Sequence, residues 1–249
     1  METSSARKTV KIDFFKPIYY PRAFLKFAGL WPTVQWKWSY MVYTILFHIT
    51  FTLFYDAFKL ISFMYLDDFS VITRAMFICL TEFALAIKVV NFYMRFSKVS
   101  SLIQKICDFK VYDEIEAKIM EKTLNFITNI EICYLAIAMV SCLFSYIAPF
   151  FAEDLILPYP GWYPIDWYNN SLNYWIVYVY QVLGMFFQAQ IFIITDVIFI
   201  YFMMMIGAQL DVLAKRLAEI GHKNSELELY RKHEVTLVEC IKEHQIILT

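Results

Sequence analysis

The 249-residue chain has little glycine and little charge: it contains 5 glycines, and 18% of its residues are Asp, Glu, Lys or Arg. The positive and negative side chains nearly balance, and the formal net charge is −1. The composition therefore does not predict a nucleic-acid partner. The five cysteines contain no CxxC pair and no dense spacing, which excludes a recognisable disulfide or zinc framework. We expect free thiols and neither a metal nor a cofactor.

No arrangement of residues typical of catalysis is found. The four histidines (His48, His222, His233 and His244) form no HExxH motif or metal-binding set. A P-loop, a GxSxG turn and a paired acidic motif are also missing. The first 37 residues lack the short apolar core and cleavage site of a signal peptide. The sequence therefore predicts a protein that is not an enzyme and whose first span acts as its own insertion signal.

Apolar residues, in contrast, make up 60% of the chain and aromatic residues 19%. They gather in four blocks, each at least as long as the roughly 20 residues that cross a bilayer as a helix. The blocks predict spans over residues 38–58, 71–92, 126–148 and 175–205. The expected fold is all-α, a polytopic membrane helix bundle with four transmembrane helices and helical extensions beyond the membrane.

Three segments follow from this pattern. Residues 1–37 mix basic and aromatic residues and predict a short interfacial helix interrupted at Pro17, Pro21 and Pro32. Residues 38–206 form the four-span bundle. Residues 207–249 predict two amphipathic helices, because apolar residues recur at helical spacing among Lys, Arg and Glu.

Lysine and arginine predict the orientation of the bundle. Residues 1–37 contain 7 of them, whereas the connector between the second and third spans and the tail after the fourth contain 6 each. The loop from Pro149 to Tyr174 contains none. We therefore expect a cytosolic N-terminus and an extracellular loop. That loop includes Asn169-Asn170-Ser171, the only N-glycosylation sequon, with Asn169 as the candidate acceptor.

Ionisable residues within spans are candidate functional groups. Counting along the helices at ~1.5 Å per residue places His48 and Glu82 at similar depth, and predicts a hydrogen bond between them. Lys88, Asp196 and Glu131 come out near the inner boundary, which predicts an ion pair of Lys88 with one of the two carboxylates. The alternative is that each group contacts water independently.

Aromatic, small and methionine side chains in the outer halves of the second, third and fourth spans suggest an apolar ligand pocket. The candidates are Phe77, Ser141, Phe144, Ala148, Tyr178 and Met185. Residues 157–164, rich in proline and aromatics, suggest a structured cap over its mouth. From spacing alone, ordinary helix packing with an aromatic anchor at the membrane interface remains open.

Taken in order, these features resemble the insect odorant receptor family. The resemblance rests on the loop at 157–166 leading into an aromatic span, on Leu210, Leu213, Arg216 and Leu217 followed by Glu239 to His244, and on the basic, cytosolic N-terminus. G-protein-coupled receptors have the opposite orientation, with the N-terminus outside the cell.

The resemblance implies a seven-helix subunit of a ligand-gated cation channel that assembles as a hetero-tetramer with a co-receptor subunit. It implies a plasma-membrane location in sensory dendrites and contact with membrane lipid. Small hydrophobic odorants would bind between outer halves of the spans, which favours the pocket reading of the six candidates. The segment 207–249 would begin the family's cytosolic anchor domain.

The sequence departs from the family pattern because it ends at Thr249, without a fifth, sixth or seventh span. A truncated gene model, a fragment and a short isoform are the alternatives, and we expect no odorant-evoked current from this polypeptide with a co-receptor. A gustatory receptor relative and a membrane scaffold or assembly subunit remain alternative functions.

Overall fold

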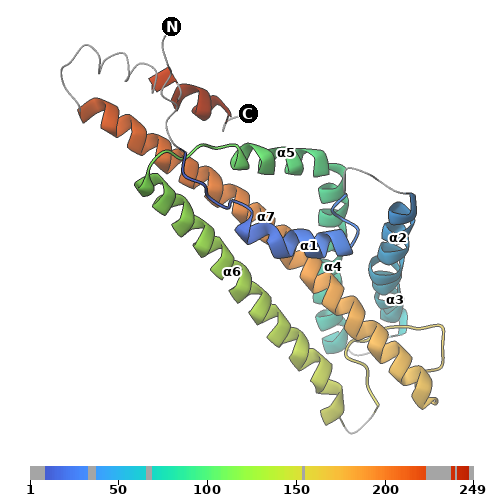
Figure 1. The fold of residues 1–249 in the computed structure, drawn as a ribbon. Coiled ribbons are helices and arrows are strands. Elements are labelled where there is room, and N and C mark those ends of the chain that lie inside the picture. The colour runs from blue at the N-terminus through green and yellow to red at the C-terminus, as the bar shows by residue number, and fades with distance from the viewer. Residues whose placement is uncertain are drawn as a thin grey trace. The chain divides into compact units, whose positions relative to one another are not determined.

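The computed structural model describes residues 9–32, 38–65, 69–152, 155–222, 237–238 and 240–246, without the side chains of Ser70, Arg74, Ile220, Gly221 and His222. Across these ranges the regular structure is helical, so the all-α prediction is confirmed. Figure 1 shows the elements, which are η1 (Lys16–Ile18), α1 (Tyr19–Phe27), α2 (Trp38–His48), η2 (Ile49–Leu53), α3 (Phe54–Ser62), η3 (Phe63–Tyr65), α4 (Phe69–Met94), α5 (Phe96–Cys107), α6 (Glu114–Ile147), η4 (Ala148–Phe151) and α7 (Ser171–His222).

Four helical segments of the described chain are long and apolar enough to cross a membrane: Trp38–Tyr65, Val71–Met94, Glu114–Phe151 and Ser171–Glu219. They correspond one to one with the four predicted spans. The expected helical continuation beyond the spans is also confirmed, since α6 begins at Glu114 and α7 ends at His222. The predicted end of the first span at residue 58 was wrong, because the helix continues to Tyr65.

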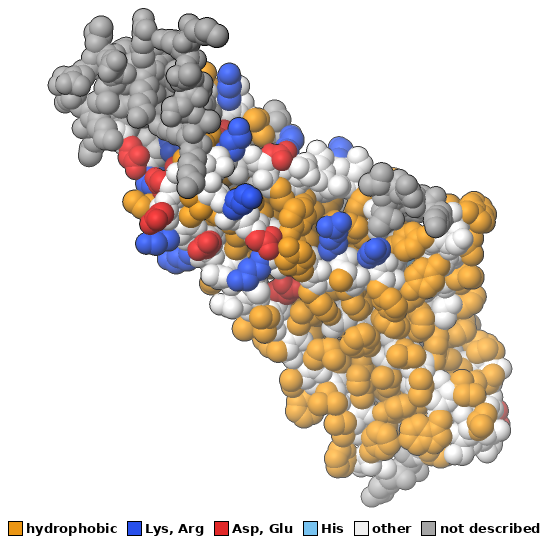
Figure 2. Space-filling model, in the orientation of Figure 1, with side chains coloured by type: hydrophobic (Ala, Val, Ile, Leu, Met, Phe, Trp, Pro, Cys, Tyr) orange, Lys and Arg blue, Asp and Glu red, His pale blue; other side chains and the backbone are white. Residues whose placement is uncertain are grey.

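The chain divides into two compact units. Unit 1 consists of Met1–Tyr19, Ser97–Ile130 and Val197–Thr249, and unit 2 consists of Tyr20–Phe96 and Glu131–Asp196. Figure 2 shows apolar side chains over most of the visible face of unit 2, whereas Lys, Arg, Asp and Glu gather on the visible face of unit 1. The segment boundaries 1–37, 38–206 and 207–249 stay a prediction. Most of the second amphipathic helix expected within residues 207–249 lies outside the described residues.

In unit 2, α7 packs closely against α3. The ring of Tyr55 is fully buried and lies where a Cβ on Gly184 would clash with it. The Tyr55 hydroxyl donates to the carbonyl oxygen of Gln181 at 3.3 Å. A glycine at position 184 is therefore required for this close approach of helix and ring.

The π-helical turn η2 interrupts the first span. In this turn the Phe54 N–H bonds the Ile49 carbonyl, five residues earlier. The Tyr180 hydroxyl donates to the Thr50 carbonyl at 2.7 Å, and the Gln188 amide donates to the Phe51 carbonyl at 3.0 Å. Two side chains of α7 thus bond the backbone of this turn and join α7 to the first span within unit 2.

The helix α1 begins unit 2 and ends at a glycine with left-handed backbone. Gly29 has φ 79°, and the Leu30 N–H returns to the Leu25 carbonyl at 2.8 Å, which closes the helix end. The prediction that Pro21 interrupts the helix was wrong. Pro21 lies in the first turn of α1, where a missing N–H breaks no intrahelical bond.

In unit 1, the N-terminal segment packs on the other elements of that unit. The buried Tyr201 hydroxyl of α7 donates to the Phe14 carbonyl at 3.2 Å, and Lys16 Nζ donates to Asn125 Oδ1 of α6 at 2.8 Å. The Val10 N–H bonds the Val111 carbonyl at 2.9 Å. These contacts hold residues 10–16 against α6 and α7 within the unit.

Candidate ligand-binding site

The α6–α7 loop is attached to unit 2 through a buried glutamine. Gln181 is fully buried on α7, and its amide accepts from the Tyr159 N–H at 3.1 Å and donates to the Tyr159 carbonyl at 2.9 Å. The same amide donates to the Tyr163 hydroxyl at 2.9 Å. Because one side chain satisfies both backbone groups of Tyr159, the loop has a defined position although its prolines exclude regular structure.

Further contacts tie the loop to neighbouring helices of unit 2. The Trp162 N–H donates to the Phe58 carbonyl of α3 at 3.0 Å, and the Tyr159 hydroxyl donates to Ser145 Oγ of α6 at 2.8 Å. Burial raises the pKa of Tyr163 well above its usual range, although the Gln181 hydrogen bond opposes this shift. Tyr163 is therefore a neutral hydrogen-bonding group across the physiological pH range.

Beside the loop lies an ion pair between the first two spans. Lys59 of α3 pairs with Glu82 of α4, and both side chains are almost completely buried. The Lys59 ammonium also lies 4.1 Å from the ring centroid of Tyr55 and 4.8 Å from that of Tyr159. Opposite charge and two aromatic faces together compensate the loss of water around this lysine.

Two cavities adjoin this region of unit 2. One, of about 570 Å³, is lined by Ser62, Tyr65, Val71, residues 155–157, residues 159–163 and Trp167. The other, of about 630 Å³, lies between α3 and α4 and is lined by Asp56, Leu60, Phe63, Ile72, Met76, Phe77, Cys79, Leu80, Glu82 and Phe83. Both volumes fall within the roughly 300–1,000 Å³ of small-molecule sites, and both linings are mainly apolar.

The predicted pocket residues occupy different environments. Phe77 lines the larger cavity but its side chain is exposed, as is that of Phe144. Tyr178 is buried and donates to the Tyr146 carbonyl of α6 at 2.5 Å. Met185 is half-buried.

The two remaining candidates lie toward the end of α6. Ser141 is exposed and donates to its own helix at the Ile137 carbonyl at 2.9 Å. Ala148 is exposed in η4. A single pocket formed by all six residues therefore stays a prediction.

The glycosylation candidate also stays a prediction. Asn169 is exposed, and its side-chain amide donates to Asp166 Oδ2 at 2.9 Å. The two hydrogen bonds from Asn169 lower the pKa of Asp166, so this carboxylate is charged in the loop.

The two expected pairings of ionisable groups have different outcomes. Lys88 Nζ lies 2.7 Å from Asp196 Oδ1, which confirms the predicted pair of Lys88 with one of the two carboxylates. The predicted His48–Glu82 hydrogen bond was wrong. Glu82 pairs with Lys59, and His48 Nδ1 lies 3.3 Å from Thr52 Oγ1 of its own helical turn.

Lys59 and Gln181 are the residues that sequence reasoning missed. Lys59 falls just after the predicted first span, residues 38–58, so it was not among the ionisable residues considered within spans. The available signal for the Lys59–Glu82 pair was a lysine one helical turn after Asp56, followed by an apolar span whose single carboxylate is Glu82. Gln181 offered no such signal, because an amide within a span has no charge to balance.

Four long apolar helices within the described residues define the class as a multi-pass membrane protein. Residues 68–249 match the family model described as 7tm Odorant receptor. The chain belongs to this odorant receptor family. The family consists of receptors, so the prediction that the chain is not an enzyme is confirmed.

Individual relatives agree with this assignment. The chain is 23% identical over 205 residues to odorant receptor Or1 of Anopheles gambiae, covering 80% of this chain and 49% of that protein. It is 26% identical over 247 residues to odorant receptor 59a of Drosophila melanogaster, covering 95% and 59%. Its fold resembles the olfactory receptor OR5 of Machilis hrabei, with TM-score 0.73, 15% identity, and coverage of 95% and 66%. The chain thus spans about half to two thirds of these relatives.

Proposed function

We propose that this chain supplies ligand-binding spans of an odorant receptor subunit in a ligand-gated cation channel. The ligands are small, volatile, hydrophobic molecules. They bind in unit 2, among the helices that contact α7. The observation that carries the proposal is the α6–α7 loop: Gln181 holds an aromatic segment at a fixed place beside an apolar cavity of about 570 Å³. Such a lining selects shape and apolar area with few directional bonds.

Within this proposal, Phe77, Ser141, Phe144, Ala148, Tyr178 and Met185 remain the candidate contacts. Phe77 lines the cavity between α3 and α4, whereas Tyr178 and Met185 belong to α7 and are at least half-buried. Tyr178 also packs on Phe150 and Trp175 at centroid distances of 5.8 and 5.4 Å, so a ligand near it would meet an aromatic wall.

The orientation and partners belong to the same proposal. Lysine and arginine counts support a cytosolic N-terminus and an extracellular α6–α7 loop. The family supports a plasma-membrane location. The family supports assembly with a co-receptor subunit as a hetero-tetramer in a sensory neuron. Exposed apolar side chains cover much of the first three spans, which suits contact with lipid and with further helices.

A thermal-stability assay on the chain in lipid nanodiscs tests this function. A panel of uncharged volatile esters, alcohols and terpenes should contain members that raise the unfolding temperature saturably. Met185→Gln should change which members act, whereas Met203→Gln, at an exposed methionine of the same helix, should not. A membrane scaffold without a pocket would tolerate both changes and show no saturable response, which would contradict the proposal.

A further inference from the structure

Glu82 of α4 has one carboxylate oxygen that is bonded and one that has no protein partner. Its Oε1 pairs with Lys59, whereas no hydrogen bond to its buried Oε2 is found among the described residues. A buried acceptor without a donor costs about 1–3 kcal/mol elsewhere in proteins, and more when the group is charged. The ion pair alone therefore does not account for a carboxylate at this position.

The unpartnered oxygen belongs to a residue in the wall of a cavity. Glu82 lines the cavity of about 630 Å³ between α3 and α4. The other buried side-chain atoms without a hydrogen bond in the described part of the chain are His48 Nε2, Glu131 Oε1 and Gln188 Oε1. None of these three residues lines that cavity or the cavity of about 570 Å³ beside the loop.

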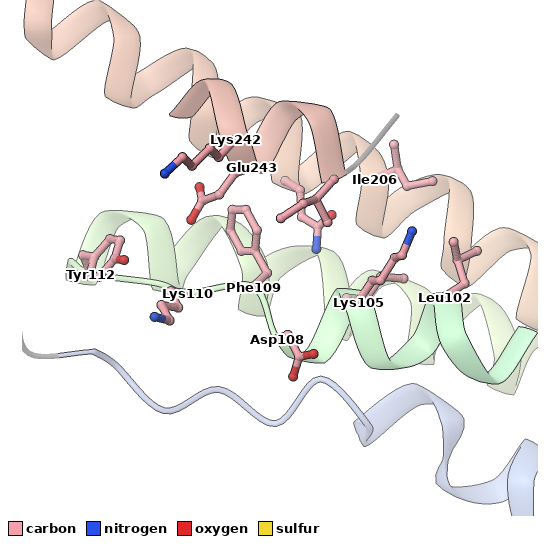
Figure 3. A pocket seen from close by; sticks show the side chains of 12 residues that line it. Leu102, Lys105, Asp108, Phe109, Lys110, Tyr112, Ile206, Lys242 and Glu243 are labelled. Atoms are coloured by element: carbon pink, nitrogen blue, oxygen red, sulfur yellow. The ribbon is translucent and has the colours of Figure 1, made fainter. Parts of the chain in front are cut away.

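A cavity in unit 1 differs in this respect. It has a volume of about 360 Å³, and Figure 3 shows the side chains around it. Both carboxylates of its lining are bonded: Glu243 Oε2 accepts from Arg216 Nη1 at 2.6 Å, and Asp108 Oδ1 accepts from Gln104 at 2.9 Å. None of the unpartnered atoms found in the described chain belongs to its lining. Of these three cavities, the one between α3 and α4 is thus where a ligand would meet an unsatisfied acceptor.

The charges around the α3–α4 cavity favour a cation. Among the described side chains, Asp56 and Glu82 line it, and Lys59 pairs with Glu82. Asp56 Oδ1 accepts from the neutral amide of Gln188 at 3.0 Å. Two carboxylates and one ammonium leave a formal charge of −1 beside apolar side chains. A neutral ligand leaves this charge uncompensated, whereas a protonated amine balances it.

The rest of the lining suits a short hydrocarbon chain with a cationic end. Leu60, Met76 and Phe77 supply apolar area, and phenylalanine rings also attract a cation placed over their faces. The terminal torsion of a glutamate side chain is broad. A small rotation of the Glu82 carboxylate therefore turns its buried Oε2 toward a donor in the cavity.

We propose that the cavity between α3 and α4 binds an aliphatic primary amine in its protonated form. The ammonium donates to Glu82 Oε2 and lies near Asp56, and the alkyl chain packs on Leu60, Met76 and Phe77. This inference rests on the proposed function, and it names a ligand class for the larger of the two cavities of unit 2. An ester or a terpene supplies apolar area without the donor that this cavity requires.

Protection of Cys79 tests the proposal, because this free cysteine lines the cavity. The full chain in nanodiscs is treated with methyl methanethiosulfonate, and modification of Cys79 is followed by mass spectrometry. Hexylamine should slow this modification saturably, and hexanol should need an at least about tenfold higher concentration for the same protection. The exposed Cys133 of α6 should react at the same rate throughout. Equal protection by hexanol, or no protection by hexylamine, would overturn the proposal.

Hexyl acetate separates this inference from the proposed function. It has the same alkyl chain without a hydrogen-bond donor, so it should raise the unfolding temperature and give Cys79 little protection. If esters stabilised the chain saturably and hexylamine left Cys79 unprotected, the amine site alone would be wrong. If no ligand of either kind acted saturably, the proposed function would be contradicted as well.

Two variants with a matched control identify the contacts. Lys59→Met combined with Glu82→Met replaces the ion pair at similar volume, a change that buried pairs often tolerate, and should abolish protection by hexylamine. Asp56→Asn keeps the pair and should raise the half-protecting hexylamine concentration roughly threefold. Lys88→Met combined with Asp196→Met removes an ion pair of α4 outside the cavity and should leave protection unchanged.

The unfolding temperature without ligand shows whether each variant keeps its fold. Full protection by hexylamine in a folded Lys59→Met, Glu82→Met chain would contradict the contact with Glu82. An unchanged half-protecting concentration in Asp56→Asn would contradict the role of the second carboxylate, whether or not the double variant folds.

Discussion

The Lys88 ammonium lies 2.7 Å from Asp196 Oδ1 and thereby joins α4 to α7 within unit 2. It also lies 3.7 Å from the ring centroid of Phe192, one helical turn before Asp196. The pair is about one-third exposed, at 34% for the lysine and 27% for the aspartate. It is therefore less costly to form than a fully buried pair, and breaking it leaves one charge beside apolar side chains.

Reversing the charge of this lysine should destabilise the chain, and reversing both charges should restore it. Lys88→Glu places two carboxylates together and should cost about 2 kcal/mol, a value below the 3–5 kcal/mol of fully buried pairs. Lys88→Glu combined with Asp196→Lys should recover most of the unfolding temperature measured in nanodiscs. Lys88→Glu with Glu131→Lys is the matched control and should give no recovery. If Lys88→Glu recovered its unfolding temperature with Glu131→Lys and not with Asp196→Lys, the wrong carboxylate would have been assigned to Lys88.

Removing the Gln181 amide should release the α6–α7 loop. Gln181→Ala leaves the Tyr159 N–H, the Tyr159 carbonyl and the Tyr163 hydroxyl without their partner, at a cost of about 1–3 kcal/mol. We expect faster amide exchange and faster proteolysis between residues 157 and 164. The control is Gln190→Ala, which removes a buried amide of the same helix whose oxygen accepts from α1 instead of the loop. If the loop of Gln181→Ala exchanged at the wild-type rate, the attachment described above would be wrong.

Acid should weaken unit 1 partly through Asp113. Burial alone would raise the pKa of Asp113, but the hydrogen bond from Lys215 at 2.5 Å and one from the Glu116 N–H at 2.6 Å lower it. A lowered folded-state pKa gives stability above the unfolded-state value of about 3.9, and this stability is lost as the pH falls through the folded-state value. Asp113→Asn should therefore reduce the drop in unfolding temperature between about pH 5 and 3. The control is Asp211→Asn at an exposed position of α7, which should show the same drop in unfolding temperature as wild type. If Asp113→Asn and wild type lost the same unfolding temperature over this pH range, Asp113 would not contribute to the acid sensitivity.

Asn169 reports the orientation of the α6–α7 loop. If the loop is extracellular, a fraction of the chain made in insect cells should lose mass on glycosidase treatment, and Ser171→Ala should abolish that fraction. Asp166→Ala should increase it, because Asp166 accepts a hydrogen bond from the amide nitrogen that carries the glycan. The variant Glu2→Asn introduces a sequon at the N-terminus and should add no glycan there. Modification of Glu2→Asn but not of Asn169 would reverse the proposed orientation.

The sequence was sufficient for the four apolar helices, since length and hydrophobicity alone determine which segments suit a bilayer. It was also sufficient to predict that Lys88 pairs with Asp196 or Glu131, because charges within apolar segments have few possible partners, but it did not decide between the two carboxylates. It failed for Glu82, whose partner depended on the π-helical turn and on how far the first span continues. Rotation of one helix relative to another decides such contacts, and no local pattern records it. The attachment of the loop to Gln181 was inaccessible for the same reason.

The central claim, a ligand site for uncharged volatile molecules in unit 2, is tested most directly by photolabelling. A hexyl ester carrying a diazirine would be cross-linked to the chain in nanodiscs, and the labelled residues mapped by mass spectrometry. The account predicts saturable labelling near Phe77, Tyr178, Met185 and residues 159–163, competed by the unmodified ester. Labelling spread over exposed apolar residues such as Leu53 and Met203, without competition, would contradict it.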